Sequence, residues 1–384
     1  MKKKSIIHII TRLINGGADE NTVLTCNYSV ALGNKVTLII GTANDKEILS
    51  KVDKRVNLIK LKHLIRSINP IKDILALIQI KSLIKKLSPD VVHTHTSKAG
   101  VLGRISAWLS GVPLIVHSVH ILPFVNVNFV LKAIYLIIEK LIEKITHKYI
   151  NVSSGMMDIA IKYKIGSPSK HSVIYSAFDT YKFKNATKAS DLEEYLISKR
   201  TADDLKIILM IAAFEKRKRH KQLIEIFSKI CKKHPNTILF LVGDGKLILD
   251  IKNQVKKLEL EKNVIFTGFR DDPERIIALA DICIINSERE GLPRAVIQYT
   301  AGGKPSICAN LPGIEEIIKD GVNGYVFNIK DFQKLYSKLS HLLSNPEDLK
   351  RLTKGAKETD VSRWSVEFMG KKIEKLYDMS LSIK

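Results

Sequence analysis

The chain has 384 residues, of which 62 are Lys or Arg and 39 are Asp or Glu, giving a formal net charge of +23; 45% are hydrophobic. This length exceeds what one hydrophobic core usually serves, and the composition excludes a disordered chain, so we expect two globular domains. The positive charge favours polyanionic partners such as nucleotide phosphates, anionic lipid or nucleic acid, although much of it is lysine scattered over helices.

The first half of the chain alternates between strand-like and helix-like runs. We predict strands at SIIHII, KVTLIIG, VNLIKL, DVVHTH, PLIVHSVH, KYINVS and SVIYSA, and helices at 72–87 and 129–144 among others. Strands separated by amphipathic helices are typical of βαβ units and a parallel sheet. We therefore predict one doubly wound α/β domain over residues 1–180.

The second half repeats this rhythm after a polar, irregular stretch at 181–204, which we predict to be a linker with one short helix. Strands are predicted at KIILMIAAF, TILFLVGD, VIFTGF, DICIIN, PSICAN and GYVF, within a second doubly wound domain at 205–363. The tail 364–384 is an amphipathic helix that could pack back on the first domain. The strand ends of two such domains would face each other across a ligand cleft.

The cysteines and the N-terminus bear on the cellular location. Cys26, Cys231, Cys283 and Cys308 show no paired spacing, which is typical of reduced thiols in a cytosolic protein. The apolar run in MKKKSIIHIITR is too short for a signal peptide, and no stretch reaches the roughly 20 apolar residues of a spanning helix. We expect a cytoplasmic protein that lies at most on a membrane surface.

Two segments of the first half place glycine or histidine next to strand ends. In INGGADENT, Gly16 and Gly17 follow the first strand and open a helix, so the backbone could approach a phosphate closely, although a tight turn explains them equally well. In VVHTHTSKAG, His93 and His95 share one side of a strand, with Lys98 in the turn. His-x-His can bind a metal, but no third ligand has convincing spacing, so a cleft-lining pair is favoured.

Further polar groups end other predicted strands. His120, at the end of VHSVHILPF, could hydrogen-bond a sugar or acceptor hydroxyl as a neutral imidazole. The run 216–221, KRKRHK, would clamp a diphosphate at a strand–helix junction or form a solvated basic face. VGDGK adds a second glycine loop. In SEREGLPRAVIQYTAGGKP, Glu290 follows a buried strand, where it could contact a ligand or merely favour the helix N-terminus.

Together these segments resemble retaining glycosyltransferase family 4. Glu290-Gly-Leu-Pro, seven residues to position 298 and then AGGKP are similar to its Glu-x7-Glu signature, with Gln298 in place of the second Glu. GGADENT, HTHTSKAGVLGR, VHSVH, VIYSAFD, VGDGK and IEEIIKDGVNGYVF resemble further family segments in the same order. The resemblance spans nearly the whole chain and implies the GT-B fold, with two Rossmann-like domains facing each other across a cleft.

The resemblance also implies roles for individual residues. Glu290 would touch the transferred sugar, Lys218 would grip the donor diphosphate and His120 would lie near the sugar, so these three form the expected catalytic set. The expected donor-binding residues are Gly16, Gly17, Arg217, Arg219, Gly243, Gly245, Gly291, Leu292, Pro293, Gln298 and Glu316. His93, His95 and Lys98 are expected on the acceptor side. Ala213 stands where the family commonly has an Arg, so Arg217 or Arg219 would compensate.

The resemblance implies a hexosyl- or glycosyltransferase of class EC 2.4 that retains the anomeric configuration. The donor would be a nucleoside-diphosphate sugar, with a UDP-sugar favoured, and the acceptor would be lipid-linked or an oligosaccharide. The product would belong to the synthesis of bacterial capsule, O-antigen or lipopolysaccharide. The chain has no Asp-x-Asp, so we expect no metal and no cofactor, with Lys, Arg and helix N-termini neutralising the leaving diphosphate. Basic amphipathic helices at 72–87 and 129–144 would lie on the inner face of the cell membrane or simply cover the sheet.

Two other functions fit parts of the sequence. An epimerase of the GT-B type would convert a UDP-sugar without any acceptor. A non-enzymatic protein that binds nucleic acid would use the positive charge, but no helix-turn-helix, RNP-type strand or Cys/His finger is visible. We therefore expect no nucleic-acid partner.

Overall fold

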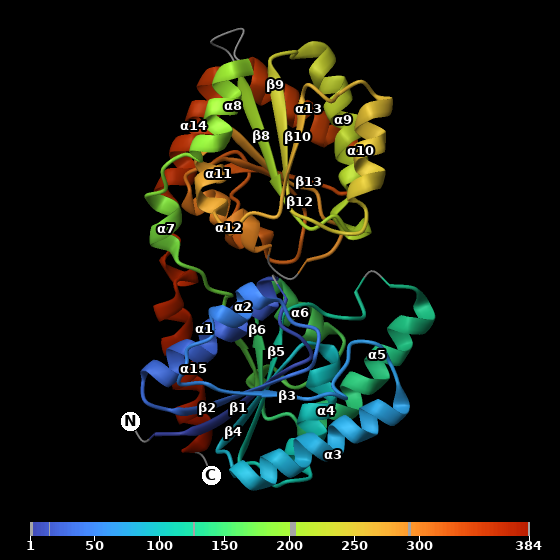
Figure 1. Ribbon diagram of the computed structural model, residues 1–384, viewed down its shortest axis with the longest axis vertical. Helices are drawn as coiled ribbons and strands as arrows, with labels where there is room; N and C mark the ends of the chain where they lie inside the picture. Colours follow the sequence, from blue (N-terminus) through green and yellow to red (C-terminus); the bar gives the residue numbers. More distant parts are fainter. Residues whose placement is uncertain (1–2, 15, 126, 200–204, 291–292, 383–384) are drawn as a thin grey trace. The chain divides into compact units, whose positions relative to one another are not determined.

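The computed structural model describes residues 3–14, 16–125, 127–199, 205–290 and 293–382. The chain divides into two compact units: unit 1 comprises Met1–Phe178 and Arg363–Lys384, and unit 2 comprises Asp179–Ser362. Each unit is a parallel sheet covered by helices (Figure 1). The predicted doubly wound α/β architecture is confirmed in both.

Unit 1 is built on a seven-stranded sheet with the order β3-β2-β1-β4-β5-β6-β7, and every pairing is parallel. The strands are β1 Ser5–Ile10, β2 Lys35–Ile40, β3 Asn57–Lys60, β4 Val91–His95, β5 Leu114–Val119, β6 Lys148–Asn151 and β7 His171–Val173. The helices are α1 Gly17–Ala31, α2 Lys46–Ser50, α3 Pro70–Leu87, α4 Ser97–Trp108, α5 Phe129–Ile142, α6 Ser154–Lys162 and α15 Val366–Leu381.

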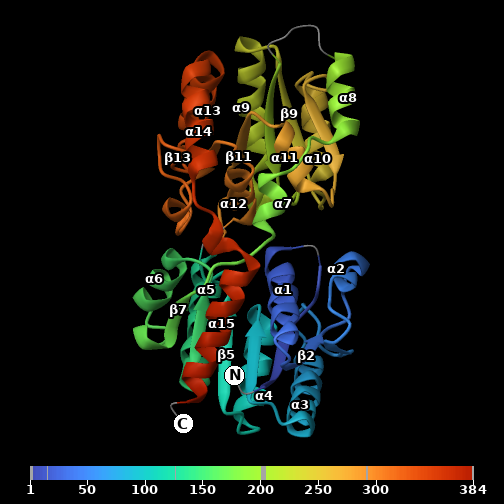
Figure 2. The same cartoon turned by 90° about the vertical axis from the view of Figure 1, so that its left-hand side faces the viewer.

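The two faces of this sheet are buried by different helices. Successive side chains of a strand point to opposite faces, so Ile7 and Ile9 of β1 pack with α3 and α4, whereas Ile6 packs with α15 and Ile10 with α1. Helices α1 and α15 contact each other, as Figure 2 shows. Because the strands are apolar on both faces, they read as continuous hydrophobic runs. The C-terminal helix α15 is thus an integral part of unit 1.

Unit 2 is built on a six-stranded parallel sheet with the order β10-β9-β8-β11-β12-β13. The strands are β8 Lys206–Ile211, β9 Thr237–Val242, β10 Val264–Gly268, β11 Ile282–Ile285, β12 Ser306–Ala309 and β13 Gly324–Phe327. The helices are α7 Thr180–Lys184, α8 Ser190–Lys199, α9 His220–Lys233, α10 Ile248–Lys257, α11 Pro273–Leu279, α12 Arg294–Ala301, α13 Phe332–Ser344 and α14 Pro346–Glu358.

One predicted boundary needs correction. The segment 181–204 is not a linker over its described part, because α7 and α8 belong to unit 2 and α7 contacts α11 and α12. Buried Phe183 and Ala189 anchor the segment, and Ala189 donates a backbone hydrogen bond to Arg275. The polar composition of this stretch concealed these few apolar anchors. The chain passes from unit 1 to unit 2 at residues 178–179 and returns at 362–363.

Candidate active site

Three neighbouring strands of unit 2 end in polar segments. β8, β11 and β12 lie side by side and parallel, so the residues that follow them emerge at one edge of the sheet. The segment 212–219 after β8 carries the basic run, 286–290 after β11 ends in Glu290, and 310–316 after β12 ends in Glu316. The carboxyl edge of such a sheet is where ligands bind in open α/β folds.

Two cations from the β8 segment hold the Glu290 carboxylate. The same oxygen, Oε1, accepts hydrogen bonds from Lys218 Nζ and from Arg217 Nη1, the latter at 2.7 Å, and only 14% of the Glu290 side chain is exposed. Burial alone would raise the pKa of Glu290, but the charges of Lys218 and Arg217 outweigh it and hold the pKa below its ordinary value. Glu290 is therefore ionised at neutral pH.

Backbone contacts fix the two segments to each other. The Glu288 N–H donates to the Arg217 carbonyl at 2.7 Å, and the buried Asn286 side chain donates to the Arg219 carbonyl at 3.0 Å. Arg217 Nη1 also donates to the Arg289 carbonyl at 3.2 Å. The contact between Glu290 and its cations is therefore built into the loops and does not depend on the side chains alone.

Arg219 does not join this cluster. Its backbone adopts a left-handed conformation, φ 56°, directly before α9, and its guanidinium stacks over the Phe332 ring at 4.7 Å. Arg219 Nη1 lies 3.4 Å from the Ile329 carbonyl. Of the two arginines expected to compensate for Ala213, the structure brings Arg217 to Glu290 and turns Arg219 toward the segment between β13 and α13.

The glycine loop after β9 packs on the loop after β8. Gly243 has φ 137°, and a Cβ there would lie 2.3 Å from the Ala212 carbonyl oxygen; Gly245 has φ 152°, and a Cβ there would lie 2.8 Å from the Phe214 backbone. The Phe214 N–H donates to the Asp244 carbonyl at 2.9 Å. These glycines thus let two strand-end loops pack together, which positions the segment that carries Lys218.

The remaining expected donor-binding residues of unit 2 lie around the same edge. Buried Pro293 precedes α12, half-buried Gln298 lies in the second turn of α12, and half-buried Glu316 ends the short 3-10 helix after β12. Gly291 and Leu292 lie outside the described residues. Gln298 and Glu316 thus belong to the segments that follow β11 and β12, two neighbouring strands of the sheet.

In unit 1, the glycine loop is accompanied by a carboxylate that the sequence analysis missed. Gly16 precedes α1 and Gly17 begins it, at the carboxyl end of β1. Asp19, in the first turn, is 7% exposed, and its pKa is raised to about 7, mainly by burial and despite the nearby Arg12. The acid in GGADENT was visible in the sequence, but its burial was not.

The sequence analysis also missed one member of a buried histidine group. His8 of β1 lies on the α1/α15 face together with His93 and His95 of β4, and all three are fully buried. His8 Nδ1 lies 3.0 Å from His95 Nε2, and His95 Nδ1 lies 3.2 Å from His120 Nε2. His93 bonds Tyr377 of α15 at 2.6 Å. A chain of three imidazoles therefore leads from the core to His120.

The orientation of the protons in this chain follows from one unpartnered atom. His8 Nε2 is buried without a hydrogen-bond partner. With a lone pair at this unpartnered position, the His8 proton lies on Nδ1. His8 then donates to His95, and His95 donates to His120 Nε2. A neutral His120 consequently carries its proton on Nδ1.

A third histidine near His93 and His95 corrects the expectation that no third metal ligand exists. One nitrogen from each of His8, His93 and His95 lies within 4.8 Å of the others. Five of their six nitrogens already have partners, however, because His93 Nε2 also bonds Ser118 at 2.7 Å. The arrangement is therefore organised as a hydrogen-bond network, in which burial lowers the pKa of every member.

Lys98 lies apart from these histidines. Its ammonium pairs with Asp73 of α3 at 2.6 Å and also donates to the Ser67 carbonyl. Only 14% of the Lys98 side chain is exposed. The ion pair ties the start of α4 to the start of α3, so the structure gives Lys98 a clear structural role.

A cavity of about 120 Å³ opens at the carboxyl ends of β4 and β5. His120 lines it, together with a second strand-end histidine, His117. The other lining residues are Ala18, Thr96, Ser97, Ser118, Val119, Ile121, Leu122, Pro123, Glu139, Tyr149, Ala160, Ile165 and His171. The cavity is thus bordered by the histidine network on one side and by apolar side chains on another.

Known proteins match both units. Residues 17–152 match the family described as Glycosyl transferase 4-like, and residues 192–359 match Glycosyl transferases group 1. An Escherichia coli protein, UDP-Gal:alpha-D-GlcNAc-diphosphoundecaprenol alpha-1,3-galactosyltransferase, is 30% identical over 319 residues, which cover 82% of this chain and 81% of the relative. The chain belongs to the GT-B glycosyltransferases. The expected enzyme class, EC 2.4, is confirmed.

Further relatives of this glycosyltransferase agree. The Staphylococcus aureus capsular polysaccharide biosynthesis glycosyltransferase CapM is 21% identical over 388 residues, covering 99% of this chain and 98% of the relative. The crystal structure of Anabaena Alr3699/HepE in complex with UDP and glucose matches 98% of this chain and 100% of its own, with a TM-score of 0.81 and 18% identity. The expected GT-B fold is thereby confirmed.

Proposed function

We propose that this glycosyltransferase moves a hexose, with retention and without a metal ion, from a UDP-sugar to a lipid-linked glycan in the synthesis of a bacterial surface polysaccharide. The observation that carries the proposal is the ionised Glu290 held by Lys218 and Arg217 at the carboxyl edge of the unit 2 sheet. This arrangement provides both signs of charge that glycosyl transfer requires.

Each sign of charge suits one part of the reaction. A departing diphosphate gains negative charge, which Lys218 and Arg217 can neutralise without a metal. The anomeric carbon gains positive charge, which the Glu290 carboxylate can stabilise. We assign the ribose and nucleotide to Gln298 and Glu316, and the transferred sugar and diphosphate to His120 and the Gly16–Gly17 loop of unit 1. Family resemblance supports these assignments and the retained configuration.

The printed functions of the relatives support the choice of substrates. The Escherichia coli relative is named for a UDP-Gal donor and a GlcNAc-diphosphoundecaprenol acceptor, and CapM is named for capsular polysaccharide biosynthesis. The HepE structure contains UDP and glucose. UDP-galactose and a diphosphate-linked GlcNAc lipid are therefore the first substrates to test.

We expect EDTA-treated enzyme to transfer galactose from UDP-galactose to GlcNAc-diphosphoundecaprenol, with an α linkage detectable by NMR of the product. Lys218 and Arg217 supply the positive charge that a metal would otherwise provide. Activity that disappears with EDTA and returns with Mn²⁺ would contradict metal independence.

Conversion of the UDP-sugar in the absence of any acceptor would indicate an epimerase instead of a transferase. A thermal-shift panel of UDP-, GDP- and ADP-sugars would reveal a different donor.

We also propose that the outer surface of α3 and α5 lies on the inner face of the membrane. Both helices contact α4 on the same side of the unit 1 sheet (Figure 1). Apolar side chains are exposed on both: Ile71 74%, Ile74 61% and Ile78 56% on α3; Phe129 85%, Ile137 60% and Leu141 64% on α5. Lysines accompany them: Lys72, Lys81, Lys85, Lys86, Lys132, Lys140 and Lys144. No helix in the described part of the chain is long and apolar enough to span a bilayer.

Flotation with vesicles tests this surface. The protein should float with vesicles containing anionic phosphatidylglycerol at low salt, and less at high salt, because salt screens the lysines. The double substitution Ile71→Ser and Ile74→Ser should weaken flotation, whereas Leu249→Ser, at a 69% exposed site in unit 2, should not. Flotation that is absent, or equal in all three proteins, would argue against the α3/α5 surface.

A further inference from the structure

We infer that the cavity at the ends of β4 and β5 is a subsite for a neutral saccharide group of the acceptor, recognised through hydrogen-bond acceptors at His117 and Glu139. The inference rests on the proposed function for the identity of the bound group as part of an acceptor. Every lining residue of the cavity belongs to unit 1.

The proton on His117 can be placed from its neighbour. Thr94 Oγ1 donates to the Val116 carbonyl at 3.2 Å, so the contact of 2.9 Å between Thr94 Oγ1 and His117 Nδ1 has to be donated by the imidazole. A neutral His117 then has a bare lone pair on Nε2. Within the described residues, the hydrogen bond of the His117 ring is made by Nδ1, and His117 lines the cavity.

His117 is held neutral in this position. Burial, followed by the charge of Arg104 and the proximity of His120, lowers its pKa well below the ordinary value. The ring also lies against Gly100 of α4, where an added Cβ would approach His117 Cε1 at 2.6 Å. A neutral, fixed imidazole of this kind offers the cavity an acceptor and no donor.

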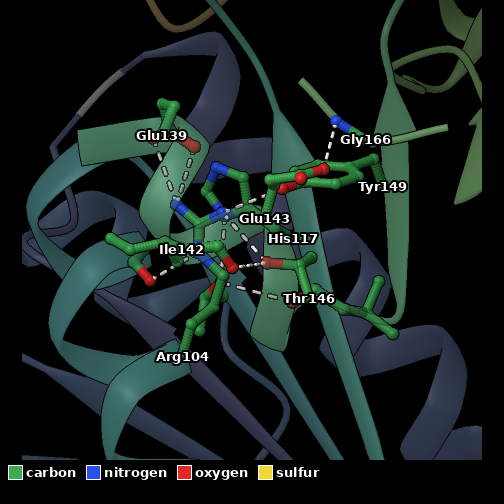
Figure 3. A network of polar contacts seen from close by, with 11 residues as sticks. Arg104, His117, Glu139, Ile142, Glu143, Thr146, Tyr149 and Gly166 are labelled. Atoms are coloured by element: carbon green, nitrogen blue, oxygen red, sulfur yellow. Dashed lines mark hydrogen bonds and ion pairs between the residues drawn. The ribbon is translucent and has the colours of Figure 1, made fainter. Parts of the chain in front are cut away.

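The second acceptor is Glu139 of α5, which is 8% exposed and also lines the cavity. Arg104 is fully buried and donates through Nη2 to both Glu139 oxygens at 3.1 Å (Figure 3). The other Arg104 nitrogens donate to the Gly100 carbonyl at 2.8 Å and to Thr146 Oγ1 at 3.2 Å. The Arg104 guanidinium is therefore committed to protein partners, whereas the Glu139 carboxylate, which lines the cavity, has acceptor capacity beyond its two contacts with Arg104.

His171 also lines the cavity, but both of its ring nitrogens are already hydrogen-bonded within the protein. Its Nε2 lies 2.8 Å from the Ile165 carbonyl and its Nδ1 3.0 Å from the Asn151 amide, so both nitrogens are satisfied. Leu122, Pro123 and Ile165 supply apolar surface. Hydroxyl or acetamide N–H donors beside C–H groups match this part of the lining, whereas an anion placed here would meet the Glu139 carboxylate and the His117 lone pair.

The size of the cavity agrees with a sugar group. By the same measure one water molecule needs roughly 15 Å³, so about 120 Å³ holds several times that volume but not a nucleotide. A monosaccharide of the acceptor, or its N-acetyl substituent, fits the volume of the cavity, carries no charge and supplies hydrogen-bond donors.

Saturation-transfer NMR tests the subsite without requiring turnover. Full-length protein should bind methyl α-N-acetylglucosaminide and not the anionic methyl α-glucuronide. His117→Asn keeps a donor toward Thr94 but removes the Nε2 acceptor, so the neutral glycoside should bind about tenfold more weakly, as for one lost hydrogen bond. Ala160→Leu fills the cavity and should abolish binding. His341→Asn, at an exposed site of unit 2, should bind like wild type.

Several results would overturn the subsite. These are no binding of the neutral glycoside by wild type, unchanged binding by His117→Asn in a protein with native tryptophan fluorescence, or equal binding of the glucuronide. If Ala160→Leu does not fold, the result with His117→Asn decides whether the subsite exists. If His117→Asn does not fold, the result with Ala160→Leu decides. Wild type that binds the glycoside but transfers no sugar from any nucleotide donor would reject the proposed function and retain the subsite.

Discussion

Replacing Glu290 with alanine should lower kcat by about 10²–10³, which is the cost of removing one preorganised electrostatic group from a transition state. The donor KM should stay within a few-fold, or fall, because Lys218 and Arg217 are released from the carboxylate and become free to bind the diphosphate. Glu290→Gln keeps the volume of the side chain and loses its charge, so it should be nearly as slow as Glu290→Ala. Initial rates over a range of donor and acceptor concentrations measure both constants.

The matched control is Glu261→Ala, which removes an exposed carboxylate of unit 2 from the segment that precedes β10, on the amino side of that strand. It should leave both constants unchanged. A UDP-induced thermal shift in Glu290→Ala would show that unit 2 is folded. Wild-type turnover in a folded Glu290→Ala protein would refute the role of this carboxylate, and a selective rise in the donor KM would reassign it to ground-state binding.

The stability of unit 1 should fall steeply below about pH 6.5. Burial lowers the pKa of His8 to about 3 and the pKa values of His93, His95 and His117 well below the ordinary value. These imidazoles stay neutral in the folded protein, whereas the unfolded chain takes up protons near pH 6.5. Since the unfolded state then binds more protons, the free energy of unfolding decreases as pH falls, by about 1.4 kcal/mol per pH unit for each histidine.

Tryptophan fluorescence isolates this effect, because both tryptophans, Trp108 and Trp364, lie in unit 1. Urea unfolding at pH 7, 6 and 5 should give a slope of about 4 kcal/mol per pH unit: four neutral histidines contribute about 5.5, and Asp19, whose raised pKa lets the folded state bind one proton, subtracts about 1.4. His8→Asn should reduce the slope by about one proton, and His341→Asn, on the surface, should leave it unchanged. A free energy of unfolding that does not vary over this range would show that the cluster is charged or open in the folded state.

Much of the fold could be predicted from the sequence because its signals are local. Apolar β-branched runs such as 5–10 and 282–285 are long enough to be buried strands, and the helical periods between them require parallel pairing. The resemblance in ordered motifs then led to the correct fold and enzyme class, those of a GT-B glycosyltransferase. The predicted linker was wrong because two buried anchors, Phe183 and Ala189, decide its packing and leave little trace in a polar segment.

The candidate site, like the fold, could be predicted from the sequence only in part. Glu290 and the basic run could be singled out because each directly follows a strand, and adjacent parallel strands deliver their ends to one edge. That Lys218 and Arg217 reach this carboxylate while Arg219 turns to Phe332 depends on the left-handed turn before α9, which a charged run does not reveal. Asp19 belongs to the GGADENT motif, but its raised pKa follows mainly from its burial, which the sequence does not show.

By itself, the sequence determined the order of strands and helices, the two-domain plan and the placement of acids and bases at strand ends, because these depend on residues close together in the chain. The tertiary structure alone decided which distant side chains meet: His8 with His95, Tyr377 with His93, and Arg104 with Glu139. Proton positions, neutral imidazoles and the lining of the cavity at the ends of β4 and β5 arise from those meetings, since hydrogen bonding and desolvation act through space over a few ångströms and not along the chain.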